Sequence, residues 1–161
     1  MVGAVMEPTW KELVKNKAEW KKLQYNDPRL DEFALEVENR YGLPKGMVLA
    51  IKNAGERTNP GQVSPKGAQG IMQFMPATQK LQGGMFKHDP NNPFASIDAA
   101  GKYLKFTLEN QYKGNALAAV ADYNGGPAAG KALMAGEQPP AKETQEYIDR
   151  VKTYLTEKYK K

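Results

Sequence analysis

A single glutamate stands where an apolar segment gives way to a loop rich in Gly, Pro and Asn. Glu56 follows residues 47–51, which are apolar nearly all round and therefore typical of a buried helix. A carboxyl group at the end of such a helix is partly withdrawn from water, which raises its pKa by penalising the charged form. A raised pKa suits a general acid near neutral pH. Glu56 is therefore the candidate catalytic residue, although a glutamate in a turn is by itself usually only a solvated helix end.

The segment after Glu56 has the composition of a binding groove. The loop 57–70 holds Asn, Pro, Ser and Gly residues that restrict its backbone and fix its amides and carbonyls in place. The following "GIMQFMP" sets one polar side chain, Gln73, among Met and Phe residues. Met and Phe in this pattern are more often core than ligand contacts. A Gln beside glycines that let a ligand approach the backbone nevertheless suits a groove for a sugar chain.

A second helix end with polar side chains is expected further along the chain, in "ADYNGGP". Tyr123 and Asn124 stand there at the end of a short helix of small residues, from which aromatic and amide side chains can reach into a cleft. Asp122 precedes them and is either solvated or a second carboxylate near that cleft. The alternative for Tyr123 is core packing with a satisfied hydroxyl.

Several other chemistries lack the residues that they need. The chain has no cysteine, which excludes disulfides and thiolate metal sites. Its one histidine, His88, lies among turn residues in "KHDPNNP", and a Ser-His-Asp mechanism would have to depend on it. We therefore expect neither a metal nor a cofactor. The net charge of +5 suits an anionic surface such as a bacterial envelope, and no motif supports nucleic-acid binding.

The elements that must position these residues are all predicted to be helices. The seven main expected helices cover 8–24, 28–41, 44–55, 76–82, 96–112 and 115–125, with a last one that starts near 142. A further short helix can follow the sixth over 128–136. No segment has the period-two alternation of a strand, and no linker divides the chain. We expect one mainly α domain of about seven helices over residues 1–161.

The N-terminal "MVGAVMEPTW" lacks the basic start and long apolar core of a signal peptide. No run approaches the ~20 apolar residues of a membrane span. We therefore expect a chain made in the cytoplasm without a signal peptide or transmembrane segment.

Three segments resemble the soluble lytic transglycosylase family. "SPKGAQGIMQFMPAT" is similar to the family's Ser-x-x-Gly-Ala-x-Gly-Leu-Met-Gln-x-x-Pro-x-Thr box, which follows the catalytic Glu. "AVADYNGGP" resembles its Ala-Ala-Tyr-Asn-Ala-Gly-Pro box, and "KETQEYIDRVKTY" resembles its last motif, Glu-Thr-x-x-Tyr-Val. The three segments follow one another in the same order as in the family. They cover a core of about residues 40–155, and residues 1–26 are expected to form an N-terminal helical extension.

The resemblance implies a lysozyme-like fold with a glycan-binding cleft. It also implies cleavage of the β-1,4 bond between N-acetylmuramic acid and N-acetylglucosamine in peptidoglycan, with formation of a 1,6-anhydro product and without a cofactor. Glu56 would be the single acid and then base. The implied glycan-binding residues are Ser64, Met72, Gln73, Tyr123, Asn124 and Tyr147. The compact size resembles a monomeric bacteriophage endolysin or virion-associated enzyme acting on the cell wall.

The sequence departs from the family pattern at the catalytic position. The family has Glu-Ser with nine positions from that Glu to the Ser of the next box, whereas Glu56 to Ser64 spans 64 − 56 = 8. A gapless comparison would place Gly55 at the catalytic position, but glycine has no proton to donate. We therefore expect the helix from Pro44 to end at or just beyond Gly55, with Glu56 facing inward and Arg57 facing solvent.

Two rival functions remain open at this point. A muramidase of goose-lysozyme type would use the same glutamate with water as the acceptor. A non-catalytic module could retain the fold and bind glycan as a structural protein, and the shifted glutamate beside Arg57 favours it.

Overall fold

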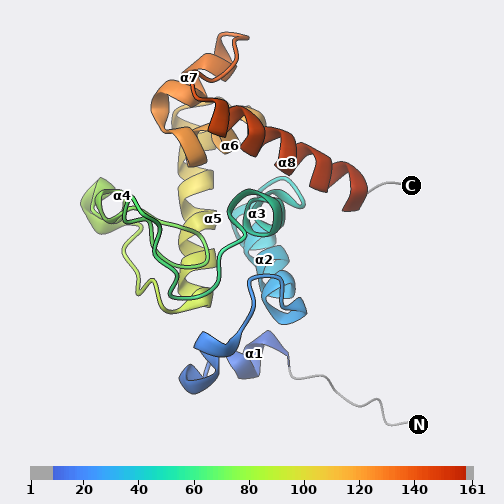
Figure 1. The fold of residues 1–161 in the computed structure, drawn as a ribbon, viewed down its shortest axis with the longest axis vertical. Helices are drawn as coiled ribbons and strands as arrows, with labels where there is room; N and C mark the ends of the chain where they lie inside the picture. The colour runs from blue at the N-terminus through green and yellow to red at the C-terminus, as the bar shows by residue number, and fades with distance from the viewer. Residues whose placement is uncertain (1–8, 159–161) are drawn as a thin grey trace.

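The long helix α5 (Pro93–Asn110) runs through the middle of the structure, with α1 toward one end of the molecule and α7 toward the other (Figure 1). The computed structural model describes residues 9–158. The remaining helices are α1 (Trp10–Leu13), α2 (Pro28–Tyr41), α3 (Met47–Ala50), α4 (Pro76–Gln79), α6 (Ala116–Gly125), α7 (Pro127–Met134) and α8 (Lys142–Lys158). Two 3₁₀ helices, η1 (Lys17–Lys22) and η3 (Leu81–Gly84), and one π-helix, η2 (Ile51–Glu56), complete the set.

The expected all-α class is confirmed. Within residues 9–158 the only strand-like pairings are two isolated bridges, Val63 with Gln69 and Gln69 with Phe74. In the same range no helix has the length and apolar character needed to cross a membrane.

Helices α2 and α5 pack against the continuous helix formed by α3 and η2, residues 47–56, which is called the central helix below. The Asp27 side chain caps α2 by accepting from the Arg29 amide, and Gly42 ends it in the left-handed region with a φ of 64°. The two helices cross closely at Gly101, where a Cβ would lie 2.3 Å from Cγ1 of Val37. Only a residue without a side chain fits this crossing.

The start of the central helix is fixed by a buried carboxylate. Glu38 on α2 accepts from the backbone amides of Gly46, at 2.6 Å, and Leu49, at 3.0 Å. The first amides of a helix have no partner inside it, and a negative charge there is stabilised by the helix dipole. Glu38 therefore ties α3 to α2, and α3 continues directly into η2.

Three expected helices differ from the structure. The one expected over 76–82 is divided into α4 and η3, and Gln82 of η3 has a φ of 50°. Residue 8 lies outside the described range, and the rest of the helix expected over 8–24 is divided into α1 and η1. The indole of Trp20 donates to the Leu13 carbonyl at 3.1 Å and so takes an acceptor that a continuous helix would need. The helix expected over 44–55 has the expected C-terminal end but changes from α to π geometry at Ile51.

Replacing Gly101 by alanine should lower the free energy of unfolding by about 1–3 kcal/mol, because the added methyl overpacks the α2–α5 crossing. Urea unfolding measures this loss. Lys102→Ala changes the exposed neighbour on the same helix and should alter stability by less than ~0.5 kcal/mol. Equal stabilities of the two variants would contradict the close crossing.

Candidate active site

Glu56 is the last residue of η2, and its side chain is half-buried. The next residue, Arg57, turns into the left-handed region with a φ of 56° and is exposed. Its backbone amide donates to the Lys52 carbonyl at 3.1 Å, five residues back, which is the hydrogen bond of a π-helix. The expected orientation, with Glu56 inward and Arg57 outward, is confirmed.

Tyr147 on α8 contacts Glu56 directly. Its hydroxyl donates to Oε2 of Glu56 at 2.6 Å, and its side chain is almost wholly buried. The ring lies against Gly55, where a Cβ would come within 2.5 Å of the ring carbon Cζ. Gly55 therefore provides the space that the Tyr147 ring needs. The residue that accepts the hydrogen bond from the Tyr147 hydroxyl is Glu56.

Burial raises the pKa of Glu56 to about 7. The hydrogen bond from Tyr147 and the charge of Arg150 act in the opposite direction, and the negative charge of Glu143 adds to the rise. Because this pKa lies near neutral pH, the carboxyl group can both donate and accept a proton there.

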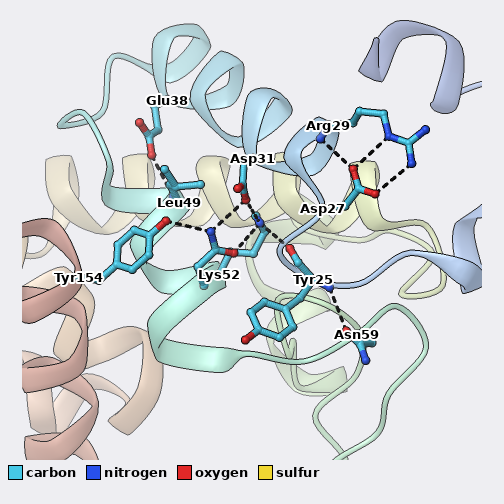
Figure 2. A network of polar contacts seen from close by, with 10 residues as sticks. Tyr25, Asp27, Arg29, Asp31, Glu38, Leu49, Lys52, Asn59 and Tyr154 are labelled. Carbon is cyan, nitrogen blue, oxygen red and sulfur yellow. Dashed lines mark hydrogen bonds and ion pairs between the residues drawn. The ribbon is translucent and has the colours of Figure 1, made fainter. Parts of the chain in front are cut away.

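The buried side chain of Lys52 ties η2 to neighbouring segments of the chain (Figure 2). Lys52 is fully buried, and its ammonium group donates to the Tyr25 carbonyl at 2.6 Å, to Oδ1 of Asp31 at 2.6 Å and to Oδ1 of Asn53 at 2.7 Å. The Asn53 amide donates in turn to Asp31 and, at 3.0 Å, to the Tyr154 hydroxyl on α8. Burial lowers the pKa of Lys52, and the Asp31 carboxylate opposes that change. The π-helix is thereby tied to α2, to α8 and to the segment before α2.

The sequence pattern does not predict this lysine network. Its only signal was a lysine directly after an apolar run, and such a residue is usually taken as the solvated edge of a helix.

A cavity of about 460 Å³ lies beside α6, and three of the expected glycan-binding residues line it: Gln73, Tyr123 and Asn124. Glu56 does not line this cavity. Tyr123 connects the two places, because it lines the cavity and its pKa is raised by burial and then by the nearby Glu56 carboxylate. Tyr123 therefore lies near both the cavity and Glu56.

Gln73 and Ser64 shape the loop between Glu56 and this cavity. Gln73 has a φ of 50°, and its side-chain amide donates to the Gly70 carbonyl at 2.8 Å. Oγ of Ser64 accepts from the Ala68 amide at 3.0 Å. Both side chains are half-buried and already hold the backbone in place.

Met72, expected to line the groove, is fully buried in the core, so its side chain offers no surface to a ligand. Its carbonyl instead accepts from the Tyr123 hydroxyl at 2.7 Å. Asn124 likewise has a local partner, because its Oδ1 accepts from the Thr144 hydroxyl at 2.8 Å.

Asp122 is a buried structural carboxylate. One of its oxygens accepts from the Tyr103 hydroxyl at 2.5 Å and the other from the Tyr112 hydroxyl. Both oxygens are therefore occupied, and the geometry gives no support to a second catalytic carboxylate at this position. Among residues 9–158, no cluster of His, Asp and Glu could hold a metal ion.

The chain is similar to known lytic transglycosylases. The transglycosylase SLT domain model matches residues 32–148. The chain is 30% identical to the soluble lytic murein transglycosylase of Escherichia coli K12 over an alignment 130 residues long, which covers 70% of this chain and 20% of that protein. It is also 30% identical to membrane-bound lytic murein transglycosylase C of Haemophilus influenzae, over 75% of this chain and 38% of that protein.

A solved structure has the same fold. It is the lytic transglycosylase Slt of Pseudomonas aeruginosa, an inactive glutamate-to-glutamine mutant, and it matches with a TM-score of 0.66 and 25% identity. The match covers 78% of this chain and 23% of that one. The chain therefore belongs to the transglycosylase SLT domain family, and it spans only a minor part of the length of these relatives.

Tyr147→Phe should raise the pKa of Glu56 above about 7, because the hydroxyl that stabilises the ionised carboxylate is lost. Titration of the Glu56 carboxyl carbon by NMR measures the change. Tyr123→Phe is the matched control, since its hydroxyl binds the Met72 carbonyl and not Glu56. A fall in the Glu56 pKa, or an equal rise in both variants, would show that the Tyr147 hydrogen bond does not have this effect.

Glu56→Gln should stabilise the protein increasingly as pH rises. The unfolded chain releases the Glu56 proton near its ordinary pKa of 4.5 and the folded chain near 7, so the wild type loses stability over that interval. Glutamine has no such titration. The variant should gain on the order of 3 kcal/mol relative to the wild type between about pH 4 and pH 8, as measured by urea unfolding.

The control is Glu146→Gln, at an exposed position of α8. Its stability relative to the wild type should not follow this pH dependence. A Glu56→Gln difference that is the same at both pH values would mean that the folded pKa is not raised.

Proposed function

We propose that this domain is a peptidoglycan lytic transglycosylase that acts at the bacterial cell wall. It would cleave the β-1,4 bond between N-acetylmuramic acid and N-acetylglucosamine and form a 1,6-anhydromuramic acid product. The observation that carries the proposal is one half-buried carboxyl group with a pKa of about 7, whose oxygen accepts the Tyr147 hydroxyl hydrogen bond. A cavity lined by Gln73, Tyr123 and Asn124 adds to it. Membership of the transglycosylase SLT domain family supports it.

In the first step the protonated Glu56 gives its proton to the bridging oxygen while the bond from that oxygen to C1 of the muramic acid breaks. The N-acetyl oxygen of the same sugar stabilises the positive charge that develops at C1. The Tyr147 hydroxyl, which donates to Glu56, stabilises the carboxylate that is left.

In the second step the C6 hydroxyl of the muramic acid attacks C1, and the Glu56 carboxylate takes the hydroxyl proton. The carboxyl group returns to its starting state, and no water is consumed. Acid–base assistance of this kind is worth roughly 10²- to 10⁴-fold in rate. Positioning of the sugars must supply much of the remainder.

The use of one carboxylate in both steps fits the surroundings of Glu56. Two-carboxylate glycosidases need a second free acidic group across the sugar. Asp122 has both oxygens occupied by tyrosine hydroxyls, so it is poorly suited to that role. The proposed reaction needs no metal and no cofactor. We further propose that the partner is the glycan strand of peptidoglycan and not a nucleic acid.

Glu56→Gln should abolish glycan cleavage, because the amide cannot donate a proton as an acid does, and the helical circular dichroism should be unchanged. Mass spectrometry of digested peptidoglycan measures both the turnover and the product. The wild type should release fragments that are lighter by one water than hydrolytic fragments, as expected for the anhydro ring.

The same experiment separates the rivals. Fragments at the hydrolytic mass would identify a muramidase of goose-lysozyme type. A wild type that binds peptidoglycan and releases nothing would identify a non-catalytic module. Activity above a few per cent in Glu56→Gln would remove Glu56 from the catalytic role.

A further inference from the structure

Arg150 on α8 binds the backbone of η2 immediately before Glu56. Its Nε donates to the Ala54 carbonyl at 2.9 Å, and its Nη2 donates to the Gly55 carbonyl at 3.0 Å. The last carbonyls of a helix have no partner within the helix. A guanidinium group is a planar fork of donors that can satisfy two neighbouring acceptors together. Arg150 therefore closes the C-terminal end of the π-helix.

Tyr147 and Arg150 are three residues apart on α8 and so lie on one face of it. The guanidinium carbon lies 5.6 Å from the centre of the Tyr147 ring, which is a cation–π distance. The same helix face thus supplies a hydroxyl to the Glu56 carboxyl group and a guanidinium to the backbone just before it.

The register of η2 decides which residue meets Tyr147. A π-helix holds more residues per turn than an α-helix and is normally the less stable form. A shift of one residue in an α-helix would rotate a side chain by about 100° around the helix axis. Such a shift would move Glu56 away from Tyr147. The Glu56–Ser64 connection is one residue shorter than in the family pattern. This fits the π-helix geometry, because the π-helix takes up one more residue and the loop after it needs one fewer.

We propose that Arg150 is a positioning residue for Glu56, which keeps the end of the π-helix in the register that presents Glu56 to Tyr147 and to the glycan. It does not itself contact the reacting bond. The inference rests on the proposed function for its kinetic consequence, but its structural consequence can be measured without any substrate.

The charge of Arg150 has a separate effect. The charged and titratable groups near Glu56 are Tyr147, Arg150 and Glu143 on α8 and Tyr123 on α6. Arg150 is the cation among them, and it lowers the pKa of Glu56. The effect of the Arg150 charge and the effect of its two guanidinium hydrogen bonds can therefore be tested by different substitutions.

The test compares Arg150→Gln, Arg150→Lys and Lys152→Gln. Lys152 is exposed on the same helix, so its variant controls for loss of one positive charge. Arg150→Gln should lower kcat for glycan cleavage by about ten- to a hundredfold, with KM nearly unchanged, because the acid is misplaced. It should also raise the pKa of Glu56. Arg150→Lys should keep that pKa close to the wild-type value but still lower kcat, since an ammonium group cannot reproduce the fork.

Hydrogen exchange of the Arg57 amide gives the readout that needs no substrate. This amide forms the π-helical bond to the Lys52 carbonyl, and it should exchange at least about tenfold faster in both Arg150 variants than in Lys152→Gln. Wild-type exchange in Arg150→Gln, or a lower melting temperature with unchanged kcat per folded molecule, would overturn the proposal. A wild type that releases no anhydro fragments would defeat only the proposed function, because the exchange and pKa results still decide the role of Arg150.

Discussion

The cost of taking the Glu56 carboxyl group out of water is the constraint on which the rest of the site depends. Burial makes the group a useful acid, but a buried carboxyl group must find partners or lose its charge. Tyr147 supplies one hydrogen bond, and α8 supplies both that tyrosine and the nearby Arg150. Helix α8 thus contacts both the Glu56 side chain and the backbone before it, and Gly55 is the residue that lets the two elements come so close.

A second buried charge, on Lys52, also holds η2 in place. Lys52 brings together acceptors from Tyr25, Asp31 and Asn53, and Asn53 extends the network to Tyr154 (Figure 2). Breaking a buried ion pair typically costs several kcal/mol because the remaining charge is left without compensation. The central helix is thus held at its start by Glu38, in its π segment by Lys52 and at its end by Arg150. Little freedom remains for Glu56 to leave its position.

Much of this could be predicted from local patterns, and the rest depended on contacts between distant residues. Asp27, Pro28 and Gly42 mark the ends of α2 in the sequence itself, and the apolar residues 47–51 identify the buried helix. The family boxes led to Glu56 and Tyr147. The change from α to π geometry could not be predicted, because Lys52 and Arg150 stabilise it through partners far away in the chain. Met72 was misplaced because a methionine beside a polar groove and a methionine in the core have the same sequence signal.

The lysine network also sets the size of the unit that can fold. Similarity to the family begins at residue 32 and ends at residue 148. Two acceptors of Lys52, the Tyr25 carbonyl and the Asp31 carboxylate, lie before that range, and Arg150 and Tyr154 lie after it. A fragment trimmed to residues 32–148 would leave the fully buried Lys52 ammonium group without its counter-ion, Asp31. Boundaries for domain swaps or fusions should therefore be drawn outside this buried network.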